Sequence, residues 1–152
     1  MKIWVDADAA PRDVKDIVAR AALRLELAAV LVANQRLETP ANNRFVTATR
    51  VKGGPDVADD HIAEQAQPGD LAVTADIPLA ARLVEKGVRV IDPRGAEYTS
   101  ENIGERLSVR DFMDQLRSTG VETGGPAAYG QKEKQAFAAA LDRALAKLMR
   151  AR

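Results

Sequence analysis

Two aspartates near the start of the chain, Asp6 and Asp8, stand where a short apolar segment ends and a helical pattern begins. Residues 2–5 have the composition of a buried strand, and Pro11 suits the first turn of a helix. In an open α/β sheet, ligands bind outside the carboxyl ends of the strands. Two carboxylates held there repel each other unless a proton or a cation lies between them. The pair therefore predicts a divalent-cation site.

A later strand also delivers an acid to its carboxyl end. Residues 71–74 form a short apolar run, and Asp76 follows Thr74 and precedes Pro78. Asp76 also suits the cap of the helix that Pro78 opens. Capping alone does not explain why a second strand ends in a carboxylate, so we expect Asp76 to lie near Asp6.

A helical pattern over residues 56–66 adds a further acid. At about 100° per residue, Asp59 lies beside the apolar stripe of this helix, whereas Asp60 points away from it. The only histidine, His61, is interpreted as a surface residue of the same helix. Carboxylates without thiolate or imidazole ligands favour Mg²⁺ or Mn²⁺ over zinc. The predicted metal ligands are Asp6, Asp8, Asp59, Asp60 and Asp76, and all but Asp60 are also the predicted catalytic residues.

Four other polar side chains are candidates for contacting a substrate phosphate or the attacking water. Asn34 follows the predicted strand 27–32, and Thr74 follows residues 71–73. Lys15 lies about one helical turn beyond Pro11, and Arg94 lies in a turn after the predicted strand 88–91. Cationic side chains commonly contact phosphate oxygens in nucleic-acid complexes.

The alternation of strand and helix patterns predicts a three-layer α/β/α sandwich with a mostly parallel central sheet. Residues 45–51 are the one further predicted strand. Two short helices are expected over residues 100–107 and 108–119, because Ser108 with Asp111 resembles a capping box. A loop over residues 121–130 leads to an amphipathic C-terminal helix, residues 131–150. We expect residues 1–152 to form one domain.

Composition narrows the classes of function. The formal net charge is +0, so any surface for RNA or other nucleic acid would have to be a local basic patch. Cysteine is absent, which excludes disulfides, thiolate zinc sites and a cysteine nucleophile. No apolar stretch approaches the ~20 residues of a membrane span, and a signal-like start is missing. We therefore expect a cytoplasmic protein without a membrane partner; its oligomeric state is left open, with a homodimer among the options.

Several segments resemble the bacterial YaiI/YqxD family of uncharacterised proteins, and the resemblance covers nearly the whole chain. The segments include residues 6–15 (DADAAPRDVK), 56–60 (DVADD) and 74–80 (TADIPLA). That family is grouped with PIN-like domains, which are metal-dependent nucleases on a compact α/β/α sandwich. The resemblance implies that Asp6 matches the first-strand acid of that wider pattern and that Asp59 matches its helical acid. Thr74 and Asp76 resemble the Thr-x-Asp of its later strand. Ala10 departs from it, because family members usually have cysteine there.

Three functions compete at this stage. The first is a Mg²⁺- or Mn²⁺-dependent nuclease that hydrolyses phosphodiesters, most simply in RNA. The second is a phosphatase that forms an aspartyl-phosphate on Asp6, although such enzymes usually carry Thr or Val where Ala10 stands. The third is a non-catalytic module that uses the acidic edge to bind metal or nucleic acid.

Overall fold

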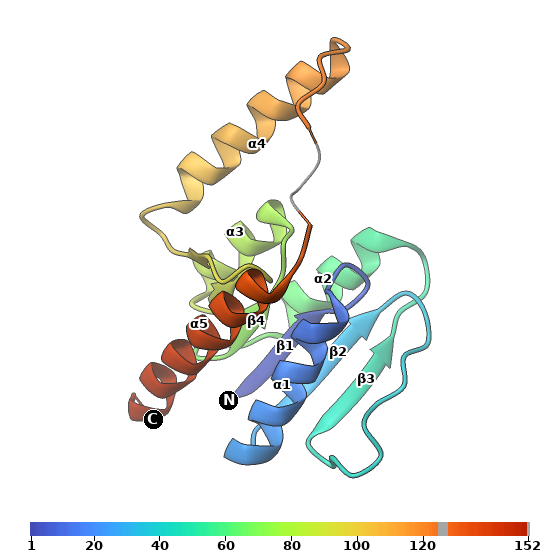
Figure 1. Cartoon of the computed structure of the whole chain (residues 1–152), viewed down its shortest axis with the longest axis vertical. Coiled ribbons are helices and arrows are strands. Elements are labelled where there is room, and N and C mark those ends of the chain that lie inside the picture. Colours follow the sequence, from blue (N-terminus) through green and yellow to red (C-terminus); the bar gives the residue numbers. More distant parts are fainter. Residues whose placement is uncertain (125–127, 152) are drawn as a thin grey trace.

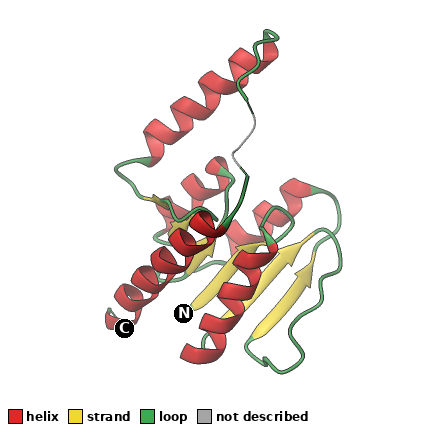
Figure 2. Cartoon of the chain, in the orientation of Figure 1, coloured by secondary structure: helices red, strands yellow, loops and turns green. Residues whose placement is uncertain are grey.

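The computed structural model describes residues 1–124 and 128–151, which contain six strands and five helices (Figures 1 and 2). The strands are β1 (Lys2–Asp6), β2 (Ala28–Ala33), β3 (Val46–Arg50), β4 (Leu71–Val73), β5 (Arg89–Ile91) and β6 (Glu97–Tyr98). The helices are α1 (Arg12–Leu25), α2 (Pro55–Gln65), α3 (Ile77–Lys86), α4 (Ile103–Ser118) and α5 (Gln131–Arg150). Within the described residues, no helix combines the length and the apolar character needed to cross a membrane.

The strands lie in the order β3-β2-β1-β4-β5-β6, and all neighbours pair in parallel except β5 with β6. The chain runs from β1 outward to β3 and then returns to the other side of β1 to form β4. The strand order therefore reverses between β1 and β4. In open parallel sheets, the crevice for ligands lies outside the carboxyl ends of the strands at such a reversal. The prediction of a mostly parallel sheet is confirmed.

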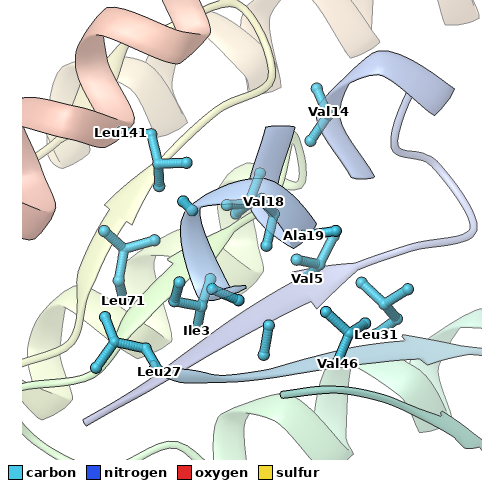
Figure 3. Close-up of a cluster of buried hydrophobic side chains, with 14 of the residues drawn as sticks. Ile3, Val5, Val14, Val18, Ala19, Leu27, Leu31, Val46, Leu71 and Leu141 are labelled. Carbon is cyan, nitrogen blue, oxygen red and sulfur yellow. The ribbon is translucent and has the colours of Figure 1, made fainter. Parts of the chain in front are cut away.

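Both faces of the sheet are covered by helices, because successive side chains of a strand point to opposite faces. Ile3 and Val5 belong to a core with residues of α1 and α5, whereas Trp4 belongs to a second core with residues of α2 and α3. Figure 3 shows Ile3 and Val5 beneath Val14 and Val18 of α1. This arrangement confirms the predicted three-layer α/β/α sandwich and explains why the central strands are apolar on both faces.

The prediction of two helices over residues 100–119 was wrong. They form the single helix α4, in which the Ser108 hydroxyl donates to the carbonyl oxygen of Gly104 at 3.1 Å. Such a bond to the preceding turn is compatible with a helix interior, so Ser108 does not cap a new helix. Strand β6 was not predicted, because two residues are too few to show a period. The C-terminal helix is confirmed as α5, and residues 125–127 of the expected loop lie outside the described residues.

Helix α4 stands away from the rest of the structure and meets it through α3 (Figure 1). None of the residues of α4 is buried, and Val109 and Phe112 are 55% and 58% exposed. The candidate site described below is built without this helix.

The amino ends of β1 and β4 are joined by one buried carboxylate. Asp70 is 5% exposed and accepts hydrogen bonds from the backbone N–H groups of Lys2 and Gln67 and from the indole N–H of Trp4, at 2.9 to 3.0 Å. These bonds satisfy the carboxylate and anchor the large Trp4 side chain beneath α2, where its ring meets His61 edge-on.

We expect Asp70→Ala to lower the free energy of unfolding by about 2–4 kcal/mol, because buried donors lose their acceptor. Urea denaturation measures the loss. Asp142→Ala is the matched control, because its carboxylate is exposed and pairs only with Arg24 among the described residues. The control should lose less than about 0.5 kcal/mol. Equal losses in the two variants would contradict the role given to Asp70.

The turn between β5 and β6 is packed against the start of α5. The Tyr129 hydroxyl donates to the carbonyl oxygen of Pro93 at 2.9 Å. Gly95 has a φ of +92°, and a Cβ placed there would lie 2.7 Å from the carbonyl oxygen of Ala136. Only glycine allows this approach of turn and helix.

Gly95→Ala should therefore destabilise the protein by about 2 kcal/mol more than Gly69→Ala, because the added methyl group collides with helix backbone. Gly69 has the same φ of +92° but has no atom within 4 Å of an added Cβ. It reports the cost of the left-handed conformation alone, about 1 kcal/mol. Thermal unfolding of both variants measures the difference. Similar midpoints would show that the turn shifts away from α5 without a loss of stability.

Candidate functional site

The site lies where the strand order reverses, and one hydroxyl joins its two central strands. Thr74, directly after β4, is 2% exposed, and its hydroxyl donates to Oδ2 of Asp6 at 2.9 Å. The hydroxyl oxygen of Thr74 in turn accepts a hydrogen bond from the backbone N–H of Asp76 at 3.0 Å. Thr74 therefore fixes the carboxylate at the end of β1 relative to the chain that leaves β4.

Asp76 has two structural roles. Its Oδ1 accepts the backbone N–H of Leu79 at 2.9 Å, which caps α3 as its sequence position suggested. Its carboxylate also lines the same hollow as Asp6. Capping uses one carboxylate oxygen, so the two interpretations of this residue are compatible.

Asp59 approaches the hollow from α2. The buried side chains of Ala58 and Ile62 hold this helix against the sheet, and Asp59 lies beside them. Burial, followed by repulsion from Asp76 and Asp6, raises the pKa of Asp59 to about 7. Burial also raises the pKa of Asp6, with Asp76 and Asp8 adding to it and the Thr74 hydrogen bond opposing it.

Asp8 is oriented by the residue that follows β2. Its Oδ2 accepts the backbone N–H of Asn34 at 2.7 Å and the Asn34 side-chain amide at 3.0 Å. Arg50 of β3 in turn donates to the backbone carbonyl oxygen of Asn34 at 3.2 Å. The side-chain oxygen of Asn34 is buried without a hydrogen-bond partner in the described part of the chain. The predicted site residue Asn34 thus contacts the acidic cluster through Asp8.

Together these elements enclose a hollow of about 330 Å³, which we call the acidic pocket. Its lining residues are Asp6, Asp8, Ala9, Ala58, Asp59, Ala75 and Asp76. The three alanines were not predicted, although each directly adjoins a predicted acid in the sequence. Their small side chains leave the space in which the carboxylates face one another.

Five of the predicted site residues do not line this pocket. Thr74 and Asn34 adjoin it through their hydrogen bonds to Asp6 and Asp8, and the other three lie elsewhere. Asp60 forms an exposed ion pair with Arg82 at 2.8 Å. Lys15 lines a separate hollow beside α1. Arg94 lies 3.6 Å from Glu133 of α5 and 5.9 Å from the centre of the Tyr129 ring. The roles assigned to the site residues from the sequence stay predictions, and the structure shows only where each of them lies.

The donor chemistry of the pocket suits a hard divalent cation, since all its charged groups are carboxylates. The geometry is less complete. Within residues 1–124 and 128–151, no three Asp, Glu, His or Cys side chains are arranged so that they could hold a metal ion. Thr74, Leu79 and Asn34 each engage a carboxylate oxygen of the cluster. Coordination of a cation would require the carboxylates of Asp6, Asp8 and Asp76 to turn toward a common centre.

Comparisons with known proteins place this arrangement in a family. The family described as "Uncharacterized BCR, YaiI/YqxD family" matches residues 4–147. A UPF0178 protein of Myxococcus xanthus is 58% identical over 150 residues, which cover 99% of this chain and 97% of that protein. The chain belongs to the YaiI/YqxD family. The UPF0178 protein YaiI of Escherichia coli O81 is 52% identical over 152 residues, covering 100% of this chain and 99% of that protein.

Family membership confirms the resemblance seen in the sequence, although the family description names no activity. The relatives' names likewise carry no substrate or cofactor. No solved structure shows a significant match to the chain. In this member of the YaiI/YqxD family, the acidic pocket is therefore the feature that bears most directly on function.

The raised pKa of Asp59 gives this pocket a measurable effect on stability. Between the ordinary value of 3.8 and about 7, the folded protein holds a proton that the unfolded chain has released. Stability therefore falls as the pH rises through this window, and the loss persists above it. Asn cannot ionise, so Asp59→Asn should be more stable than the wild type by about 1–2 kcal/mol near pH 8, after allowance for solvent screening.

Near pH 3.5, just below the ordinary value of 3.8, the gain should largely disappear, because the wild-type carboxyl is then mostly protonated in both states. Urea denaturation across this range measures the difference. Asp60→Asn is the control, since it removes the adjacent charge outside the pocket. If Asp59→Asn gained the same stability at both pH values, the raised pKa assigned to Asp59 would be wrong.

Proposed function

We propose that this member of the YaiI/YqxD family is a divalent-cation-dependent phosphodiester hydrolase, a nuclease whose substrate class is RNA. The observation that carries the proposal is the acidic pocket itself. Carboxylates from β1, from the loop after it, from α2 and from the end of β4 converge at the reversal of strand order. The resemblance of the sequence motifs to those of PIN-like domains supports the same conclusion.

The crowding of carboxylates supports a role for a cation in this pocket. Every charged group that lines the pocket is acidic. Two of these groups, Asp6 and Asp59, have raised pKa values because they are buried among the others. A bound Mg²⁺ or Mn²⁺ would compensate the repulsion, and when bound it would supply Lewis-acid activation of water and stabilisation of charge on the phosphate.

The proposed roles follow from the contacts. Asp6, Asp59 and Asp76 would hold the cation, and Asp8 would contribute directly or through a water molecule. Thr74 orients Asp6, and Asn34 orients Asp8, by the hydrogen bonds described above. We further propose that Asn34 and Thr74 position a phosphate oxygen or the attacking water. Arg94 is engaged by Glu133 and Tyr129, so we assign it to holding α5 rather than to the substrate.

A second candidate function is a non-catalytic module that binds metal through this pocket. The observation that favours it is the lack of a ready ligand set among the described residues. A pocket that must rearrange around a cation binds it more weakly than a preformed one, because ordering the side chains costs free energy. Turnover separates the two functions, since both require the cation but only the nuclease cleaves.

The deciding experiment titrates Mn²⁺ into the wild type, Asp6→Asn and Asp60→Asn by calorimetry. The same preparations are incubated with a labelled pool of single-stranded and structured RNA. We expect Asp6→Asn to weaken Mn²⁺ binding more than about 100-fold, because even partners outside the first coordination shell are worth 10–100-fold. Cleavage should disappear with it. Asp60→Asn should bind and cleave like the wild type, because Asp60 is paired with Arg82 outside the pocket.

Each other result has a definite meaning. Binding of Mn²⁺ without cleavage of RNA or DNA would overturn the nuclease and favour the binding module. A trapped phosphoenzyme that Asp6→Asn cannot form would favour the aspartyl-phosphate phosphatase instead. Absence of Mn²⁺ binding even with RNA present would contradict every function that uses this pocket for a cation.

A further inference from the structure

A second concave surface lies beside α1, on the face of the sheet that α1 and α5 cover. Two adjoining hollows of about 570 Å³ and 320 Å³ share Asp16, Ala19 and Pro40 as lining residues. Their walls are α1 and the segment 37–43 that follows β2, and Lys134 of α5 reaches the larger hollow. We call these two hollows together the α1 groove.

The far wall of the groove is fastened to α1. The side-chain amide of Asn43, which is 8% exposed, donates to the carbonyl oxygen of Ala19 at 2.8 Å. Its side-chain oxygen accepts the backbone N–H of Phe45 at 3.1 Å. Because a buried side chain holds the loop in place, the groove is largely preformed, which lowers the ordering cost of binding.

The groove is the cationic counterpart of the acidic pocket. Its lining includes the cations Arg12, Lys15, Arg20 and Lys134, against the acids Asp16 and Glu38. Lys134 lies 3.8 Å from Asp13. Within the described residues, the side chains of Arg12, Lys15 and Arg20 have no hydrogen-bond or ion-pair partner. A chain of zero net charge has thus gathered unpaired cations on one side of one helix.

We propose that the α1 groove binds a single strand of nucleic acid through its phosphates and leads it to the acidic pocket; the second half of this statement rests on the proposed function. The cations at Arg12 and Arg20 are about 12 Å apart along the helix, by its rise per residue. A strand presents more than one phosphate over such a length. Leu23, which is 49% exposed, and Pro40 provide apolar surface for bases.

The position of the groove connects it with the pocket. Asp8 lines the acidic pocket, and Arg12, only four residues later, lines the groove. Four residues span at most about 14 Å, so the two surfaces lie at the two ends of one short loop. A strand held by α1 would therefore bring a neighbouring phosphate to the carboxylates.

The size and composition of the groove favour a single strand over a duplex. Hollows of this volume accommodate individual small groups, whereas a duplex is bound by an element that enters one of its grooves. The groove has no aromatic lining residue among those that the structure describes. Binding should therefore depend on phosphate contacts, with little discrimination among bases and a strong dependence on salt.

The test measures fluorescence anisotropy without divalent cations. The probes are labelled oligouridylate and oligothymidylate of about twelve nucleotides, a duplex RNA of the same length, and a labelled polyglutamate peptide. We expect both single strands to bind the wild type better than the other two probes. Tighter binding of oligouridylate than of oligothymidylate would identify RNA as the source of the strand; equal binding would leave the shared single-strand chemistry as the determinant.

Arg12→Glu and Arg20→Glu should each weaken binding of the single strands by about tenfold or more. Arg143→Glu makes the same charge change on an exposed residue of α5 that does not line the groove, so it should stay within about twofold of the wild type. Arg20→Ala should make the dependence of binding on salt shallower, by about 0.7 in the logarithmic slope between about 50 and 200 mM salt.

Asp6→Asn separates the inference from the proposed function, because it disables the pocket and leaves the groove intact. It should bind the single strands at least as well as the wild type. Groove-dependent binding without cleavage in Mn²⁺ would overturn the nuclease and retain the inference. Unchanged binding in both arginine variants, no binding by the wild type, or a preference for the duplex or the peptide would overturn the inference, whatever the cleavage assay gives.

Discussion

The parallel pairing of β1 with both β2 and β4 is the constraint on which the structure depends. A central parallel strand has neighbours on both sides and helices on both faces, so its side chains must be apolar in both directions. Residues 3–5 meet this requirement. The requirement for apolar side chains ends where the strand ends, and Asp6 is the first position that can carry a polar side chain. Because all parallel strands end at the same edge, the residues after β2 and β4 can also be polar there.

The acidic pocket forms where the strands end and polar side chains become possible, but its composition is unfavourable for folding. Carboxylates that share a small hollow repel one another, and burial removes the water that would screen them. The chain limits the cost by engaging individual oxygens with Thr74, Leu79 and Asn34. It does not place a cationic side chain among the residues that line the pocket. A sequence under selection for stability alone would replace one of these acids, since a neutral residue of the same shape relieves the repulsion.

Much of this edge could be predicted from the sequence, because the apolar runs that form strands and the acids after them are local patterns. The phase of α2 separated Asp59 from Asp60, and the structure places them on different sides as the helical period requires. Non-local pairings could not be predicted in the same way. Arg94 meets Glu133 from a helix far along the chain, and β6 is too short to carry a period.

The α1 groove also could not be predicted from the sequence, because its far wall is a loop without periodicity. Its shape depends on one amide side chain, Asn43, whose bond to α1 links residues 24 positions apart. A net charge of zero also gives no information about where the individual charges lie in space. Here the loop between β1 and α1 separates an anionic pocket from a cationic groove. A polyanion would be held by the groove and repelled by the pocket until a divalent cation is present. In the proposed nuclease, this opposition would link cation binding to substrate entry, because an ion that relieved the crowding of the carboxylates would also remove the barrier to the phosphate.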